Sequence, residues 1–232
     1  MRVSERLPKT ISATLDLLFP LACVSCRKEG AFICEPYRPG LPELREPYCR
    51  LCAEPGPVAC QKCLADPPRY DGIRAPYRME GPVREMVYGL KYRNYRAYAP
   101  HIAALLAEHI SILPSPTDGI VPIPLHKARL RERGYNQAEL MARELSKLTA
   151  MPVAVDLLSR TKNTLPQVSL ETDKERRENI RNAFTVTGDV RGLSILLLDD
   201  VVTTGATMNA AAGALKKAGA ASVWGLALAR RP

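Results

Sequence analysis

The sequence predicts a doubly wound α/β domain with a mainly parallel sheet, preceded by a small cysteine-rich module. Four apolar segments are typical of buried parallel strands and lie near residues 118–122, 153–157, 194–199 and 222–229. Helical sequence separates them, as a doubly wound fold requires. All seven cysteines lie between Cys23 and Cys63, ahead of these strands. We therefore expect an apolar core to stabilise the α/β domain and bound metal to stabilise the module.

Length and charge narrow the class of protein. A chain of 232 residues can hold one sizeable α/β domain and one small module. The net charge of +9 favours a polyanionic ligand, which leaves nucleic acid, a phosphorylated metabolite and acidic lipid as alternatives. No apolar run approaches the roughly 20 residues of a membrane-spanning helix, so we expect no transmembrane segment.

The N-terminal residues 1–19 are predicted to form an amphipathic helix, with its periodic part at residues 8–19. The residues before Cys23 resemble a lipoprotein cleavage site. However, Asp16 and Pro20 interrupt the apolar segment, and a secretory signal needs roughly 7–15 uninterrupted apolar residues. We therefore expect a cytoplasmic protein whose cysteines are metal ligands rather than disulfides.

Residues 20–66 are predicted to form a double zinc-ribbon-like module. Two Cys-x2-Cys pairs, separated by seven residues, supply the four thiols of its second half: Cys49, Cys52, Cys60 and Cys63. Thiolates at this spacing favour a tetrahedral structural Zn²⁺ site. Such a site can fold a segment that has almost no core of its own.

The first half of the module repeats the second with one ligand missing. The spacing Cys23-x2-Cys26-x7-Cys34 matches that of the second half, but the fourth position is Tyr37. Tyrosine is a poor zinc ligand, so this half is either a three-thiolate site completed by another group or a degenerate ribbon without metal. An interleaved site that draws on both halves is a further alternative.

The strand near residues 194–199 ends in two acids, and a Thr/Gly-rich turn and an Ala-rich helix follow. Ligands of open α/β sheets bind where such strands end. The carboxylates can hold sugar hydroxyls or a metal ion, and the turn before the helix can hold a phosphate. Together they favour a phosphorylated sugar. The candidate binding residues are Asp199, Asp200, Thr203, Thr204, Gly205, Ala206 and Thr207.

Two further segments are rich in cations. Residues 88–98 interleave tyrosines with Lys and Arg, which suits single-stranded nucleic acid but also a helix that buries its tyrosines. After the strand at 118–122, a proline-rich turn leads to Arg129, Arg131 and Arg133. This second segment is a candidate for binding a pyrophosphate. The alternative interpretation is that it forms a basic helix turn exposed to solvent.

These motifs resemble the ComF family, which includes competence protein F. The similarity rests on residues 121–126, on Arg131-x-Arg133-Gly-Tyr-Asn-Gln137, and on residues 158–170 and 196–207. The last stretch resembles the phosphoribosyl pyrophosphate (PRPP) motif of type I phosphoribosyltransferases. Tyr37 is a departure from the four-ligand ribbons usual in members with paired ribbons.

The resemblance implies a type I phosphoribosyltransferase fold over residues 67–232, with PRPP and Mg²⁺ at the 199–207 stretch. Asp199 and Asp200 would take the ribose hydroxyls, directly or through Mg²⁺, and stabilise an oxocarbenium-like centre. The order of the chain implies a lid that closes on PRPP, with these candidate residues: Gln167, Arg176, Arg177 and Asn179.

Two hypotheses follow, because nothing in the sequence identifies an acceptor or a general base. In the first, the chain is a transferase that moves a phosphoribosyl group to an unknown acceptor. In the second, it is a non-catalytic accessory protein that binds PRPP or single-stranded DNA. The family's link to DNA uptake in natural transformation makes DNA or DNA-uptake proteins candidate partners.

Overall fold

The structure is a computed structural model that describes residues 22–113, 117–161 and 183–231. The predicted N-terminal helix lies outside these residues. The chain divides into two compact units, residues 1–41 and 42–232. The second group of cysteines belongs to the larger unit, where the N–H of Ile73 donates a hydrogen bond to the carbonyl of Leu51 at 2.7 Å.

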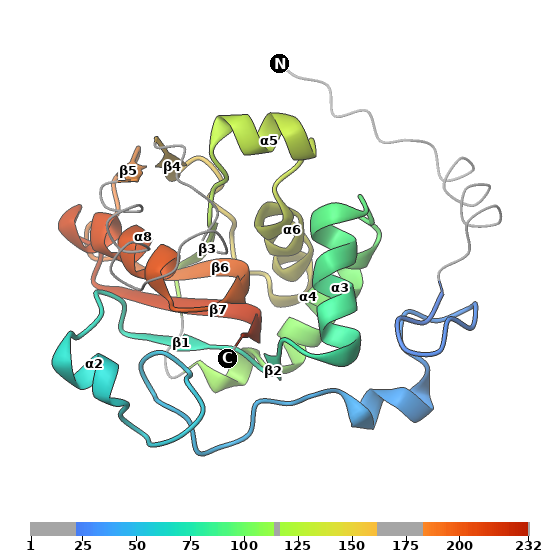
Figure 1. Cartoon of the computed structure of the whole chain (residues 1–232). Helices are drawn as coiled ribbons and strands as arrows, with labels where there is room; N and C mark the ends of the chain where they lie inside the picture. Colours follow the sequence, from blue (N-terminus) through green and yellow to red (C-terminus); the bar gives the residue numbers. More distant parts are fainter. Residues whose placement is uncertain (1–21, 114–116, 162–182, 232) are drawn as a thin grey trace. The chain divides into compact units, whose positions relative to one another are not determined.

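A parallel sheet forms the centre of the larger unit (Figure 1). Its strand order is β1-β7-β6-β3, and β2 also pairs with β7. The strands are β1 (Gly72–Arg74), β2 (Tyr77–Arg78), β3 (Gly119–Pro122), β6 (Ser194–Val202) and β7 (Ser222–Arg230). Within the described residues the named strands of this sheet pair in parallel, and Tyr77 of β2 also makes an isolated antiparallel bridge to Glu43. The predicted α/β fold class is therefore confirmed.

Helices cover both faces of this sheet (Figure 1). On one face, Met208 and Leu215 of α8 pack with Ile195 and Leu197 of β6 in a single buried cluster. Helices α4 and α6 contact the strands from the other face, and α3 packs on α4. The helices are α3 (Gly81–Tyr92), α4 (Tyr98–Glu108), α5 (Lys127–Arg133), α6 (Gln137–Thr149) and α8 (Ala206–Lys217). None of the helices in the described ranges is long and apolar enough to cross a membrane.

The prediction of a strand near residues 153–157 is wrong. Only Val153 makes a parallel bridge, to Ile120 of β3. The chain turns at residues 155–156, directly after this bridge, so no longer ladder forms there. The next strand, β4 (Leu158–Arg160), instead pairs antiparallel with β5 (Phe184–Val186) in a separate two-stranded sheet.

The strand predicted over 194–199 is longer in the structure, because β6 continues through both aspartates to Val202. Its central residues Leu196, Leu197 and Leu198 are completely buried, as expected for a strand covered by helices on both faces. The cationic segment after β3 forms the helix α5. His126 caps its start, since its ring Nδ1 accepts a hydrogen bond from the N–H of Ala128 at 3.2 Å.

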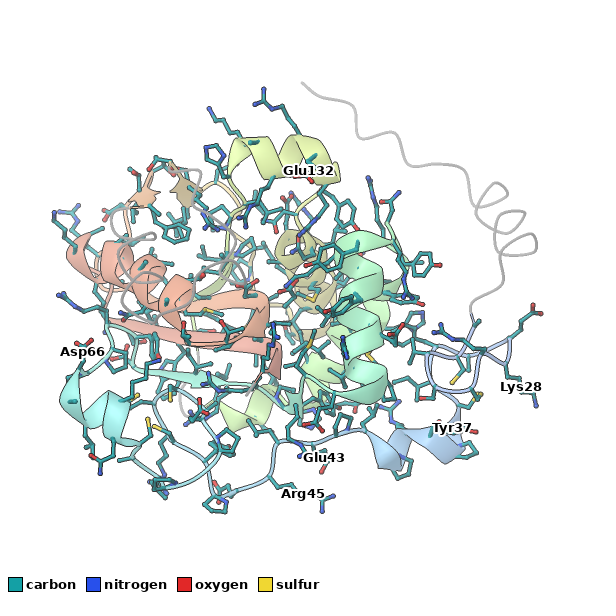
Figure 2. All side chains as sticks on the ribbon, in the orientation of Figure 1. Lys28, Tyr37, Glu43, Arg45, Asp66 and Glu132 are labelled. Carbon is teal, nitrogen blue, oxygen red and sulfur yellow. The ribbon has the colours of Figure 1, made fainter. Side chains whose placement is uncertain are left out.

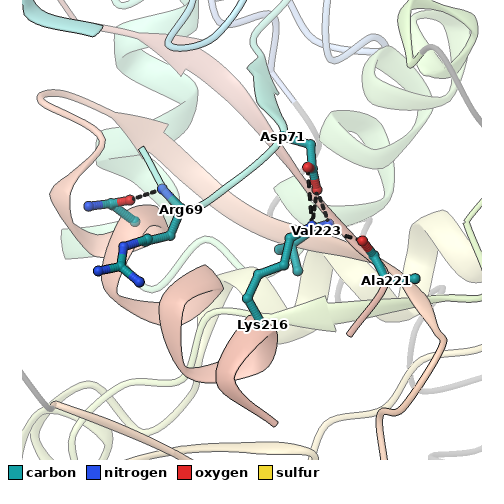
Figure 3. Close-up of polar contacts among 6 residues, drawn as sticks. Arg69, Asp71, Lys216, Ala221 and Val223 are labelled. Carbon is teal, nitrogen blue, oxygen red and sulfur yellow. Dashed lines mark hydrogen bonds and ion pairs between the residues drawn. The ribbon is translucent and has the colours of Figure 1, made fainter. Parts of the chain in front are cut away.

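A charged contact holds the entrance of β1 against β7 and α8 (Figure 3). Oδ2 of Asp71 accepts a hydrogen bond from the N–H of Val223 at 2.6 Å and lies 2.8 Å from Nζ of Lys216. The same ammonium donates to the carbonyl of Ala221 at 2.8 Å. One carboxylate thus fixes the start of β7 and the last turn of α8 together.

We expect Asp71→Ala to lower the free energy of unfolding by about 1–2 kcal/mol, because the N–H of Val223 and the ammonium of Lys216 lose their acceptor. Asp71→Asn should lower the free energy of unfolding by less, since its amide oxygen can still accept a hydrogen bond from the N–H of Val223. Urea denaturation followed by circular dichroism measures both. Equal stability of the wild type and both variants would show that this contact does not stabilise the fold.

Candidate functional site

The turn between β6 and α8 has a specific geometry. Oγ1 of Thr204 accepts a hydrogen bond from the N–H of Ala206 at 3.3 Å. Gly205 has a φ of 77°, in the left-handed region. A Cβ atom at this position would lie 2.9 Å from the hydroxyl oxygen of Tyr70, so a side chain does not fit without movement. The turn therefore brings the first turn of α8 to the end of β6, where backbone N–H groups and the helix dipole favour an anion.

The two aspartates of β6 point to opposite faces of the sheet, because neighbouring residues of a strand alternate. Asp200 faces the helices α3 and α6 and is 2% exposed. Its Oδ1 lies 2.7 Å from Nζ of Lys91, and its Oδ2 accepts a hydrogen bond from Nε2 of Gln137 at 3.0 Å. Both carboxylate oxygens of Asp200 are thus bound within the protein.

Lys91 and Asp200 stabilise each other's charge in this buried position. Burial alone would lower the pKa of the Lys91 ammonium, but the carboxylates of Asp200 and Asp199 raise it above its ordinary value. Lys91 is therefore charged at neutral pH. This ion pair anchors the end of α3 to the strand that carries the candidate site.

Asp199 lies on the face of the sheet that α8 covers and is half-buried. Its Oδ1 accepts a hydrogen bond from the N–H of Asp200 at 2.8 Å. Burial, and next the carboxylate of Asp200, raise the pKa of Asp199 to about 7, although Lys91 and Arg160 oppose the rise. The carboxyl group can therefore exchange its proton near neutral pH, which is characteristic of functional sites.

Arg160 interacts electrostatically with Asp199, and Arg129 interacts in turn with Arg160. Burial lowers the pKa of Arg160 on β4, the guanidinium of Arg129 on α5 lowers it further, and Asp199 raises it. Arg129, one of the three predicted arginines, is thus close enough to Arg160 to affect its pKa. Arg131 is exposed, and the guanidinium of Arg133 lies 5.8 Å from the centre of the Tyr92 ring.

Sequence reasoning did not place Lys91, Gln137 or Arg160 in the site. Gln137 follows a Gly-Tyr-Asn helix start, and Lys91 lies in the tyrosine-rich segment, but neither pattern indicates a contact with Asp200. Their contacts join residues far apart in the chain and depend on helix packing. The predicted lid candidates lie outside the described residues: Gln167, Arg176, Arg177 and Asn179.

A cavity of about 1370 Å³ adjoins the same turn. Thr204 and Gly205 line it, together with the outer face of α8, strand β5 and the segment that carries the second group of cysteines. Cations outnumber acids in its lining, which includes Glu54 and Asp66 together with Lys62, Arg69, Lys216, Lys217 and Arg230. The cavity can therefore admit an anionic ligand beside the turn before α8.

The second group of cysteines fits a metal ion. The sulfur atoms of Cys49, Cys52, Cys60 and Cys63 all lie within 4.8 Å of one another. Cys63 comes from helix α2 (Gln61–Ala65), and the other three come from the loop before it. Four thiols converging on one point match the donor set of a closed tetrahedral site.

Comparisons with known proteins agree with this geometry. The family described as "Phosphoribosyl transferase domain" matches residues 130–232, which include β6, the turn and α8. Competence protein F of Haemophilus influenzae is 32% identical over 197 residues, covering 79% of this chain and 85% of that protein. The chain belongs to the ComF family.

Other members of the family agree over a similar length. DNA utilization protein YhgH of Salmonella typhi is 32% identical over 183 residues, covering 76% of this chain and 80% of that protein. Competence protein ComFC of Bacillus subtilis is 29% identical over 211 residues, covering 85% of this chain and 84% of that protein. The ComF resemblance of the sequence motifs is thus confirmed, and with it a phosphoribosyltransferase-like domain in this chain.

We expect Asp199→Asn to stabilise the fold at pH 8. The folded-state pKa of Asp199 is about 7, above the value near 3.9 of an unfolded chain. An unfolded chain therefore releases this proton first, and the wild type loses stability as pH rises from about 4 to 7. The variant has no such loss. Its free energy of unfolding at pH 8 should therefore exceed that of the wild type by at least about 1 kcal/mol.

Chemical denaturation of both proteins at pH 5 and pH 8 measures the difference between their free energies of unfolding. The gain of the variant over the wild type should be larger at pH 8. Asp189→Asn is a matched control, because the Asp189 side chain is 64% exposed and pairs with Arg191 at the surface. A gain that is equal at both pH values would contradict a raised pKa for Asp199.

Proposed function

We propose that this ComF protein binds PRPP at the end of β6 and has the active-site layout of a phosphoribosyltransferase. The observation that supports this most is the combination of a half-buried Asp199 on β6, the Thr204–Gly205 turn and the N-terminus of α8 within residues 199–206. A phosphorylated sugar needs acceptors for its hydroxyl groups and a phosphate-binding site at adjacent positions, and this stretch has both.

In this proposal each residue has a role. Thr203 to Thr207 hold the 5-phosphate through side-chain hydroxyls and backbone N–H groups. Asp199 accepts hydrogen bonds from the ribose hydroxyls. Asp200 keeps Lys91 and Gln137 in place, so it supports the strand end from the opposite face. Arg160 supplies positive charge beside Asp199, and Arg129 adds positive charge next to Arg160, where the diphosphate would lie.

Loss of the diphosphate from C1 of the sugar leaves positive charge on the ring. The carboxylate of Asp199 stabilises this charge electrostatically, and a bound Mg²⁺ would offset the charge of the leaving group. The predicted lid residues would close over the sugar and keep water out. The acceptor of the phosphoribosyl group stays unassigned, so the activity is proposed as binding or transfer of this group.

We also assign Zn²⁺ to Cys49, Cys52, Cys60 and Cys63, since four thiolates favour zinc over harder cations. Thiolate ligands stay reduced in a reducing compartment, which supports a cytoplasmic location.

Calorimetric titration of the full-length chain with PRPP and Mg²⁺ tests the binding proposal. The wild type should bind, and Asp199→Ala should bind at least about tenfold more weakly, because a charged hydrogen-bond acceptor contributes about 1.5–3 kcal/mol. Asp189→Ala, an exposed aspartate elsewhere, should bind like the wild type.

No binding by the wild type, or equal binding by Asp199→Ala, would refute a PRPP site here. Release of diphosphate on a panel of nucleobase and nucleotide acceptors then separates transfer from binding. Release that depends on one acceptor supports a transferase, whereas none with any acceptor supports an accessory protein.

Single-stranded DNA binding is a second candidate function, favoured by the exposed tyrosines around α3. The exposed fractions are 37% for Tyr88, 67% for Tyr92 and 44% for Tyr95. The guanidinium of Arg84 lies 5.1 Å from the centre of the Tyr88 ring, and Arg133 is similarly placed at Tyr92. Exposed rings beside cations can stack bases and neutralise phosphates. Relatives of this chain are named for competence and for DNA utilization.

Fluorescence anisotropy with a labelled single-stranded oligonucleotide tests this candidate. Tyr92→Ala should weaken binding about tenfold, since stacking contributes about 1–3 kcal/mol per base, and Tyr92→Phe should retain it. The affinity of the wild type should fall steeply with salt, and less steeply after neutralisation of Arg129, Arg131 and Arg133. Absence of binding at low salt would exclude this function.

A further inference from the structure

The first group of cysteines reproduces the backbone of the second. Arg27 and Ala53 follow the two Cys-x2-Cys pairs and have left-handed φ values of 65° and 59°. In both loops the N–H of this residue donates a hydrogen bond to the carbonyl of the first cysteine, Cys23 or Cys49, at 2.8 Å. The first loop therefore has the conformation that brings the thiols together in the second.

The sulfur atoms match as well. The N–H of Cys34 lies 3.4 Å from Sγ of Cys23, and the Sγ atoms of Cys26 and Cys34 are 3.8 Å apart. The corresponding distances in the second group are 3.5 Å and 3.6 Å. The three sulfur atoms of the first group all lie within 4.8 Å of one another. Three corners of a tetrahedral metal site are thus in place.

The fourth corner differs between the two groups. Helix α2 places Cys63 in the second group, where it is 5% exposed. The corresponding element of the first group is the 3-10 helix η1 (Glu35–Gly40), which carries Tyr37 (Figure 2). Tyr37 is 46% exposed. Among the described residues, no His, Cys, Asp or Glu side chain joins the three thiols within ligand distance.

Within residues 22–41, the described part of the first unit, the apolar core is too small to stabilise a fold without a cross-link. In residues 22–41 the buried apolar side chains besides Cys23 are those of Val24, Phe32 and Leu41. Segments below about 40 residues need a metal, disulfides or a partner for stability. Three converging thiols supply a metal site, so bound metal accounts for the fold of residues 22–41 better than a degenerate ribbon does.

We propose that Cys23, Cys26 and Cys34 hold a zinc-class divalent ion whose fourth coordination position is open beside Tyr37. Three protein ligands with an open position are the pattern of zinc ions that exchange ligands, whereas four closed ligands are structural. Three thiolates on a divalent ion leave one net negative charge, which favours a neutral donor. Water occupies the position at rest, and an imidazole nitrogen displaces it.

Metal content is the first test, measured by native mass spectrometry on the tag-free, full-length chain. The wild type should carry two zinc ions and Cys26→Ser one, because the second group of cysteines is unchanged in this variant. Tyr37→Cys should carry two. A wild type that carries one ion, lost only when the second group is mutated, would overturn the proposal.

Ligand exchange is the second test, in protein loaded with Co²⁺ and titrated with imidazole. The visible ligand-field bands of the wild type should change saturably. Tyr37→Cys should not respond, because a fourth thiolate closes the site, and Tyr37→Phe should respond like the wild type. An unchanged wild-type spectrum, or a response that persists in Tyr37→Cys, would overturn the open position. PRPP binding concerns residues of the other unit, so its outcome is independent of both tests.

Discussion

Adjacent residues of a β-strand point to opposite faces of the sheet, and this constraint organises the candidate site. Asp199 and Asp200 are neighbours in β6, so they cannot act as one pair of ligands on the same face. Asp200 is buried, paired with Lys91 and hydrogen-bonded to Gln137. Breaking such a pair leaves a buried charge without a partner, which costs about 3–5 kcal/mol. The packing of α3 and α6 against β6 therefore depends on this carboxylate.

Asp199 is the aspartate that we propose for contact with the ligand. Asp199 shares its face with the turn before α8 and with the guanidinium of Arg160, and its pKa is raised to about 7. The charge of Asp200 contributes to this raised pKa. Asp200 therefore also increases the proton affinity of Asp199. The layout agrees with membership of the ComF family.

Local sequence patterns predicted the features that local geometry determines. The apolar run before Asp199 predicted a buried strand, Gly205 predicted a tight turn, and the cysteine spacing predicted convergent thiols. Contacts between distant segments were not predictable, because they depend on how helices pack. Lys91 and Gln137 meet Asp200 from two different helices, and no periodicity indicates this. The strand expected at residues 153–157 reduces to one bridge, since a turn follows Val153 directly.

A crystal structure of the full-length chain with Mg²⁺ and PRPP tests the site at the end of β6 most directly. We expect the 5-phosphate at the first turn of α8, within hydrogen-bond distance of the Thr203–Thr207 backbone, and the ribose hydroxyls at Asp199. Asp200 should keep its contacts with Lys91 and Gln137. Electron density for PRPP at another position, with the turn before α8 occupied only by solvent, would contradict the proposed function.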